Sequence, residues 1–223
     1  MIDLIFAGYK DGARGENYPF SLVFRKGVLQ EPAVLQEVIE EMGEDDVYVK
    51  AVNAVDNDGN MGILLCVSGG GSIGNVIRNK IKRGYKILAV AGLEKKITTP
   101  IKEAAKACLG LDRATGIKCN LTTLKSDAFI SEIEAFKTLT GCTAVPVSCG
   151  GINGMEGGYT FVLEGEEEQL DKAWQIWEEI RGSQLPPIPA YDCSSCPWKA
   201  CNRSPAYDPA FSKVLYVGPE QGE

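Results

Sequence analysis

The sequence predicts an α/β fold made of two ferredoxin-like (βαββαβ) sandwiches in tandem, with a Rossmann-like sheet as the alternative. Apolar runs at strand and helix spacing follow the order βαββαβ in the first half of the chain, and the second half repeats much of this order. Two segments occupy the same place in the two halves, DGNMGILLCVSG and NGMEGGYTFVLEG, which indicates an internal duplication. We expect a first sandwich over 1–97, a connecting helix in 98–115, a second sandwich over 116–183 and a Cys/Pro-rich tail over 184–223.

In the first half, a short strand near the N-terminus and a second strand at 20–26 precede a helix, whose apolar residues recur at helical spacing between Pro32 and Gly43. The segments 47–55 and 61–68 are rich in β-forming residues and flank Asp58-Gly59, a strong signal for an antiparallel hairpin. A helix with isoleucines four residues apart follows and ends at Gly84, and 85–92 forms another strand.

In the second half, a strand is expected at 117–124 and a helix that begins at Ser126 as its N-cap, with Phe129, Ile133 and Phe136 on its apolar face. The segments 142–149 and 159–165 form strands on either side of a glycine-rich loop. An amphipathic helix with Trp174 and Trp177 on one stripe ends at Gly182. The last strand is expected at 213–218, beyond the cysteines of the tail.

The composition limits the classes of function. The 223 residues are 44% apolar and 24% charged, which is ordinary for a globular protein, and no apolar run approaches the about 20 residues of a membrane helix. The N-terminus lacks the basic leader of a secretory signal, so we expect a cytoplasmic protein with reduced thiols. The chain has no histidine, which removes imidazole as a general base and as a zinc ligand.

Three of the eight cysteines form a cluster in the stretch DCSSCPWKAC. Cys193, Cys196 and Cys201 have the spacing C-x2-C-x4-C, and closely spaced thiols in a reducing compartment are typical of iron-sulfur and structural zinc sites. The simpler alternative is three free thiols on an extended, proline-rich tail. Three further cysteines stand singly in predicted elements, where we expect small buried apolar side chains: Cys66, Cys108 and Cys119.

A metal site at the tail needs a fourth ligand. Cys149 is the first candidate, because the glycines that follow it would let the backbone approach a bulky cofactor. Alternatively, Asp192 or Asp208 supplies an oxygen ligand, or one position stays open. We expect a [4Fe-4S] cluster, with zinc as the alternative.

A glycine-rich turn is a second candidate site. The string GGGSIG places Gly69, Gly71 and Gly74 in a G-x-G-x-x-G pattern between a strand and a helix, with Glu94 about twenty residues further on, as in dinucleotide-binding units. The hairpin that precedes this turn argues against that reading, because a dinucleotide fold needs a parallel strand there. The glycines could also do no more than permit a tight turn.

Positive charge is concentrated after this turn. Nine Lys and Arg residues lie between 78 and 106 against two acidic residues, in a chain of net charge −7. A helix N-terminus at Gly69, Gly71, Ser72 and Gly74, helped by Lys95 and Lys96, could therefore bind a phosphate-bearing ligand. The acidic blocks 40–46 and 164–168 and the low isoelectric point argue against nucleic-acid binding.

Three functions follow from these sites. The first is a cytoplasmic metalloprotein that binds a [4Fe-4S] cluster and acts in electron transfer or cofactor handling in anaerobic metabolism, with a redox or cofactor-accepting protein partner. The second is an enzyme or sensor that binds a phosphate-bearing ligand or nucleotide at the glycine turn and carries a structural zinc. The third is a homo-oligomer built through exposed sheet edges. Neither nucleic acid nor a membrane is expected as a partner, and whether the chain is an enzyme stays open.

Overall fold

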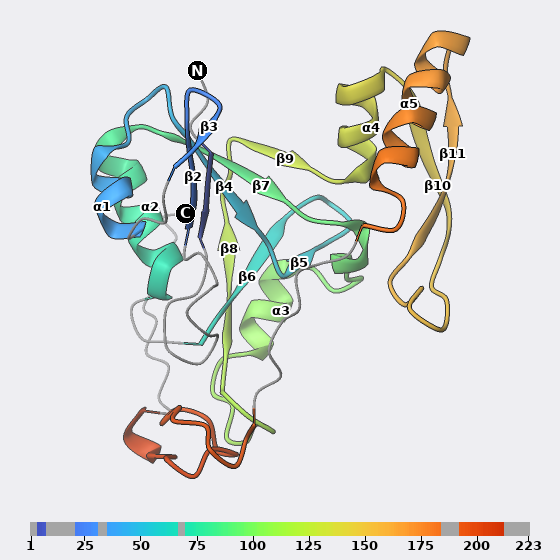
Figure 1. Cartoon of the computed structure of the whole chain (residues 1–223). Helices are drawn as coiled ribbons and strands as arrows, with labels where there is room; N and C mark the ends of the chain where they lie inside the picture. The colour runs from blue at the N-terminus through green and yellow to red at the C-terminus, as the bar shows by residue number, and fades with distance from the viewer. Residues whose placement is uncertain (1–3, 8–20, 31–34, 67–69, 184–191, 212–223) are drawn as a thin grey trace.

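The computed structural model describes residues 4–7, 21–30, 35–66, 70–183 and 192–211 (Figure 1). Within these residues the chain is a mixed α/β protein with five α-helices and three separate sheets. The α/β class expected from the sequence is therefore confirmed.

The largest sheet has six strands in the order β3-β2-β1-β4-β7-β9. Strands β1, β4, β7 and β9 are parallel to one another, and β2 and β3 extend the sheet antiparallel at one edge. Alternation along β4 and β7 places Tyr48, Ile87 and Ala89 on one face, where all three are buried. The strand bounds are β1 Leu4–Ala7, β2 Ser21–Arg25, β3 Val28–Leu29, β4 Val47–Ala51, β7 Lys86–Val90 and β9 Ala128–Ile130.

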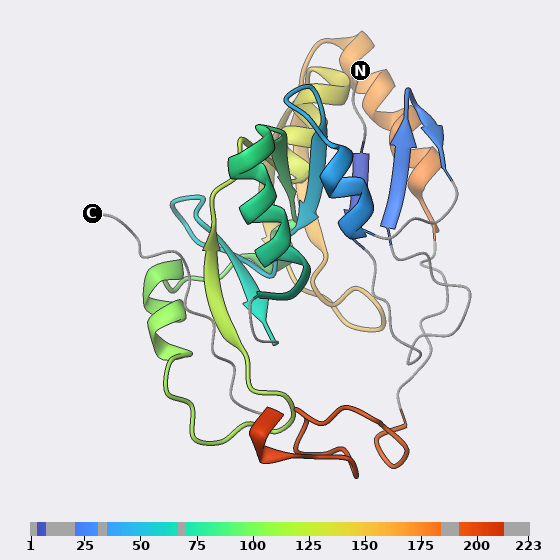
Figure 2. The ribbon, with the colours of Figure 1, turned by 90° about the vertical axis from the view of Figure 1, so that its left-hand side faces the viewer.

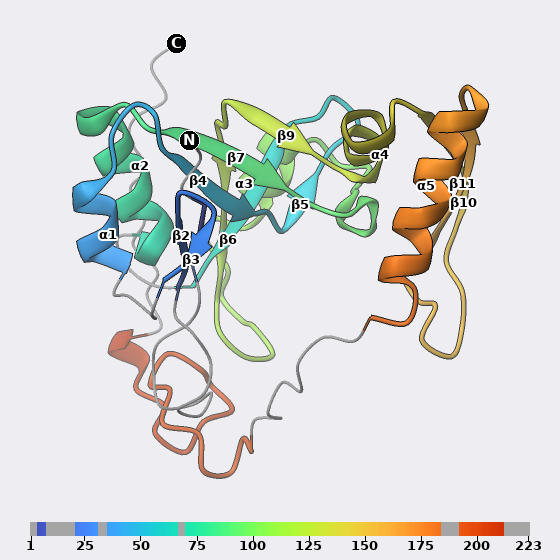
Figure 3. The same cartoon turned by 45° about the horizontal axis from the view of Figure 1, so that its top comes forward.

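Two helices cover this buried face, α1 (Leu35–Glu41) and α2 (Gly71–Arg83). They lie together on one side of the sheet (Figure 3). Ile39 of α1 and Val76 of α2 are fully buried in the same apolar cluster as the strand residues. Helix α2 ends at Gly84, whose φ of 78° is left-handed and whose N–H donates to the Lys80 carbonyl, so the predicted glycine stop is confirmed.

A second, three-stranded antiparallel sheet contains β5 (Ala54–Val55), β6 (Met61–Leu65) and β8 (Asn120–Leu124), in that order. Helix α3 (Ile101–Ala107) packs against β8 and β6. The predicted turn between β5 and β6 is built on Asp56, which is only 3% exposed. Its carboxylate accepts hydrogen bonds from the backbone amides of Asp58, Asn60 and Ile101, and so ties the hairpin to the start of α3.

The remaining elements form a layer of two helices on a β-hairpin, which projects from the rest of the molecule in Figures 1 and 3. Strands β10 (Thr143–Cys149) and β11 (Tyr159–Glu164) pair with each other, with α4 (Glu132–Thr140) packed on β10 and α5 (Glu167–Ile180) packed on α4. Helix α5 buries little besides Ala173 and leaves Trp174 64% exposed.

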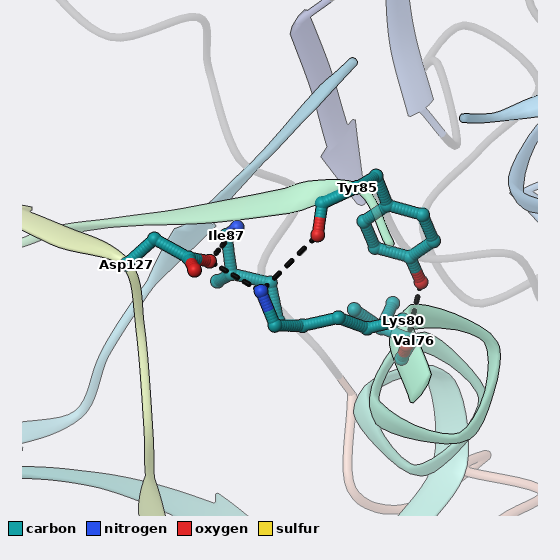
Figure 4. Close-up of polar contacts among 5 residues, drawn as sticks. All are labelled: Val76, Lys80, Tyr85, Ile87 and Asp127. Atoms are coloured by element: carbon teal, nitrogen blue, oxygen red, sulfur yellow. Dashed lines mark hydrogen bonds and ion pairs between the residues drawn. The ribbon is translucent and has the colours of Figure 1, made fainter. Parts of the chain in front are cut away.

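A polar network fastens α2 and β7 to the start of β9 (Figure 4). The Asp127 carboxylate accepts a hydrogen bond from the Ile87 amide at 2.7 Å and forms an ion pair with Lys80. The Lys80 ammonium also donates to the Tyr85 carbonyl at 3.1 Å, and the buried Tyr85 hydroxyl donates to the Val76 carbonyl. Lys80 therefore has a structural role, because its ammonium group contacts both Asp127 and the Tyr85 carbonyl.

The strand pairing differs from that of two ferredoxin-like sandwiches. A βαββαβ sandwich has an antiparallel sheet, whereas β1, β4, β7 and β9 are parallel, which gives the large sheet a weak likeness to a Rossmann-like fold. Strands from both halves also share sheets, because β8 pairs with β6 and β9 pairs with β7.

The helix expected to start at Ser126 was predicted too early. Ala128–Ile130 is strand β9, and α4 begins after the N-cap Ser131, whose hydroxyl accepts from the Ile133 amide while Glu134 completes a capping box. Edge pairing with β7 overrides the helical spacing of Phe129 with Ile133 and Phe136. The strand expected at 213–218 lies outside the described residues.

Candidate functional site

Three cysteines expected to be ordinary core residues lie close together where β6 ends and β8 begins. Leu65 and Asn120 form the last pair of the β6–β8 ladder, so Cys66 and Cys119 are opposite each other one position further along. Cys108 is the C-cap of α3, which packs on β8. Burial raises the pKa of the Cys66 and Cys119 thiols, and the charges of Cys119 on Cys66 and of Cys108 on Cys119 raise it further.

The tail segment 192–211 is held against the chain that links α3 to β8. Cys201 forms an antiparallel bridge with Ile117, two residues before Cys119. The Asn202 amide donates to the Gly116 carbonyl at 3.5 Å, and its side chain donates to the Ala114 carbonyl. Figures 1 and 2 show the tail beneath α3 and the start of β8. This docking brings six of the eight cysteines to one end of the molecule, and we call that group the cysteine-rich end: Cys66, Cys108, Cys119, Cys193, Cys196 and Cys201.

Local hydrogen bonds shape the tail around its cysteines. The Asp192 carboxylate accepts from the Ser194 amide at 2.9 Å and from the Ser194 hydroxyl at 2.7 Å, and these bonds lower the pKa of Asp192. The hydroxyl of buried Ser204 donates to the Cys196 carbonyl. Cys193 is exposed, whereas Cys196 and Cys201 are half-buried, and all are free thiols.

The cysteines are not arranged as a finished metal site. Among the residues that the structure describes, no three Cys, Asp or Glu side chains are grouped so that they could hold a metal ion. The oxygens of the two expected aspartate ligands already serve in turns, since Asp208 accepts from the Ala210 amide at 2.9 Å in the same way that Asp192 accepts from Ser194.

Cys149 lies elsewhere in the molecule. It is the exposed last residue of β10, opposite Tyr159 of β11, and it contributes to raising the pKa of Tyr159. The β10–β11 hairpin and the tail are well separated in Figures 1 and 3. The structure therefore does not bring Cys149 to the three tail cysteines.

The glycine turn and its expected lysines are also apart. Gly69 lies outside the described residues, and Gly70 and Gly71 have left-handed φ angles of 75° and 54°, which explains glycine at these positions. Ser72 is exposed in the first turn of α2 and Gly74 is buried. Lys95 and Lys96 follow the carboxyl end of β7, and Figures 1 and 3 show that end of the strand apart from the start of α2.

No protein-family model, no curated protein and no solved structure matches this chain. None of the helices in the described ranges combines the length and the apolar character needed to cross a lipid bilayer.

Of the expected site residues, the structure brings the three tail cysteines to one surface segment. Sequence reasoning missed that Cys66, Cys108 and Cys119 lie at the same end. The only local signal was the position of each cysteine at the border of a predicted element. Their proximity depends on the β6–β8 register and on the packing of α3, which no local pattern encodes.

Proposed function

We propose that the cysteine-rich end binds a thiolate-held metal centre, a [4Fe-4S] cluster in the first instance, and that the protein transfers electrons to, or hands a cofactor to, a protein partner in the cytoplasm in anaerobic metabolism. The observation that carries the proposal is the docking of Cys201 opposite Ile117, which adds the tail thiols to those of the body. A surface position suits exchange with a partner, because an exposed centre is accessible to it.

The ligands would be Cys193, Cys196 and Cys201, with a fourth thiol from Cys119 or Cys108 in place of the distant Cys149. Thiolate sulfur is the ligand of both iron-sulfur clusters and structural zinc. Since these thiols are not grouped at present, binding would require their side chains to reorient. The Cys201–Ile117 bridge and the hydrogen bonds from Asn202 join the tail to the link between α3 and β8, outside the apolar core.

Binding would also release protons, because a metal ligand must be a thiolate. A fourth thiol ligand adds one proton to those released, so the metal affinity should fall more steeply on acidification if Cys119 takes part, and because burial raises the pKa of Cys119 this dependence should extend to higher pH. That dependence distinguishes a ligand set that includes the body from one made by the tail alone.

The test is reconstitution of anaerobically purified protein with ferrous iron and sulfide. A bound cluster should absorb at about 400 nm, and the protein should contain about four irons and four sulfides per chain. We expect Cys196→Ser and Cys201→Ser to lose both, and Cys149→Ser, an exposed cysteine away from the tail, to keep both.

The variants Cys108→Ser and Cys119→Ser identify the fourth ligand, since only the one that supplies it should reduce the iron content. A colourless protein that holds one zinc, lost in Cys196→Ser, would favour the zinc alternative. The proposal fails if wild-type protein binds neither metal, or if Cys196→Ser and Cys201→Ser bind as much as the wild type.

A further inference from the structure

An open surface cavity of about 420 Å³ lies at the carboxyl ends of the parallel strands β4, β7 and β9. Its apolar wall comes from the ends of these strands and from the first turns of α4, through Val52, Val90, Ile130 and Ala135. Parallel strands end at the same edge of a sheet, and this edge is where open α/β sheets most often bind small molecules. The volume is within the range of ligand pockets.

Two carboxylates lie on one side of the cavity. The Leu93 amide donates to Glu132 Oε2 at 2.9 Å and so fixes the Glu132 side chain at the start of α4. A Cβ placed on Gly92 would overlap Glu94 Oε2 and lie 2.8 Å from Glu132 Oε1, so both carboxylates face the same glycine. Gly92 has an ordinary φ of −69°, so glycine is required here by this close approach and not by the backbone conformation.

One cation accompanies the two anions. Lys95 Nζ lies 3.7 Å from Glu94 Oε1, at the long end of ion-pair distances, and both side chains are partly exposed. The three charged residues that line the cavity therefore carry a net charge of −1. At the nearby start of α4, the capping box of Ser131 and Glu134 uses two of the free amide groups, those of Ser131 and Ile133.

The β10–β11 hairpin stands beside these carboxylates. A Cβ on Gly157 would lie 3.2 Å from Glu94 Cβ, so the loop that ends the hairpin touches Glu94. Partial burial raises the pKa of Tyr159 at the start of β11, and the charges of Cys149, Glu132 and Glu94 raise it further.

We propose that this cavity binds a small aliphatic ammonium compound. The ammonium group lies between Glu94 and Glu132, and the aliphatic body lies against Val52, Val90 and Ile130. An anion of the same size would be repelled by these two carboxylates at the charged side of the cavity. A primary ammonium group offers three donors, enough for both carboxylates and one further acceptor.

Two sources share this chemistry, a simple alkylamine and an amino acid. Only the binding of an amino acid should depend on Lys95, because an amino acid has a carboxylate that can pair with Lys95 and an alkylamine has none. In an alkylamine complex Lys95 only competes with the ligand for Glu94. The variant Lys95→Gln therefore separates the two sources.

The experiment is calorimetric titration of the full chain with n-butylamine, with L-valine and, as the control of opposite charge, with butyrate. We expect one of the two ammonium compounds to bind and butyrate not to bind. Glu94→Gln and Glu132→Gln should each weaken the binding about tenfold or more, since each removes one charge-assisted hydrogen bond. In Glu132→Gln the new amide oxygen can still accept from the Leu93 amide, which protects the fold.

Gly92→Ala is the second variant, because it keeps all the charges and displaces both carboxylates; it should also weaken the binding. Lys95→Gln should weaken valine binding but leave butylamine binding unchanged or tighter. The proposal is overturned if neither ammonium compound binds the wild type at about 10 mM, a concentration above that of weak millimolar binding. It is equally overturned if butyrate binds more tightly, or if Glu94→Gln and Glu132→Gln bind as the wild type does.

Discussion

The Asp127 carboxylate should be worth about 2 kcal/mol to the stability of the fold. It accepts from the Ile87 amide at 2.7 Å, and a hydrogen bond to a charged group contributes about 1.5 kcal/mol or more. It also pairs with Lys80, but because the Asp127 side chain is 43% exposed, solvent screens this pair and its contribution is about 0.5 kcal/mol. Asp127→Ala removes both interactions. Asp127→Asn keeps an oxygen for the Ile87 amide and should lose only about 1 kcal/mol.

Urea unfolding measures these losses. With a slope of about 2 kcal/mol per molar, the midpoint should fall by about 1 M for Asp127→Ala and by about 0.5 M for Asp127→Asn. Asp45→Asn is the matched control, because Asp45 is exposed and has no hydrogen bond or ion pair with any described residue, and it should leave the midpoint unchanged.

The same network predicts a pH dependence. Burial alone would raise the pKa of Asp127, but the hydrogen bond and charge of Lys80 and the Ile87 amide outweigh it and hold the pKa below its ordinary value. The stabilisation is therefore complete above the unfolded-state pKa of about 3.9 and is lost as the pH falls through the lower native pKa. The difference between wild type and Asp127→Asn should shrink as the pH falls below about 4. If the urea midpoint of Asp127→Ala equals that of the wild type at pH 7, the Asp127 interactions drawn in Figure 4 do not stabilise the fold.

Two further predictions concern turns. Gly84→Ala should lower the free energy of unfolding by about 2 kcal/mol, because φ is 78° and the new Cβ would lie 2.8 Å from Glu44 Cγ. Gly110→Ala should lower it by only about 1 kcal/mol, because φ is 72° but no neighbour lies within 4 Å of the new Cβ. Equal losses in urea unfolding would contradict the contact with Glu44. Asp56→Ala should cost about 3 kcal/mol, because it leaves three backbone amides, including the buried amide of Ile101, without their acceptor. Burial would raise the pKa of Asp56, but these hydrogen bonds lower it, so the wild-type advantage should be present at neutral pH and be lost on acidification below about 4. A wild-type advantage that is unchanged between pH 7 and pH 3 would argue against this role for the carboxylate.

The two proposed sites lie at different places on the same framework. The cysteine-rich end is built where the three-stranded sheet ends, and the ammonium cavity where the parallel strands end. Each has its own binding assay, so the loss of metal in a Cys201 variant and the loss of amine in a Glu132 variant should be independent of each other. Coupling between the two assays would indicate that the variants disturb the fold itself.

The candidate sites could be predicted only in part. The tail spacing of Cys193, Cys196 and Cys201 is visible in the sequence, because short spacing alone keeps these residues near one another. The position of Cys119 opposite Cys66 was not visible, since it depends on a pairing between strands that are far apart in the chain. The cavity was missed for the same reason: Glu94 and Glu132 follow different strands, and only the parallel pairing of β7 with β9 places them at one edge.

The sequence by itself determined where most helices and strands lie and that the chain is α/β. The signals that predicted them are the apolar periodicity, the Asp-Gly turn and the helix stop at Gly84. Each depends on interactions between residues a few positions apart, so a local sequence pattern is enough to predict it. Only the tertiary structure decided which strands pair, that residues 128–130 form an edge strand instead of a helix, and which cysteines and carboxylates far apart in the chain lie near one another. These outcomes depend on burial of one face of a sheet against elements far away in the chain, and that free energy exists only once the whole core is assembled.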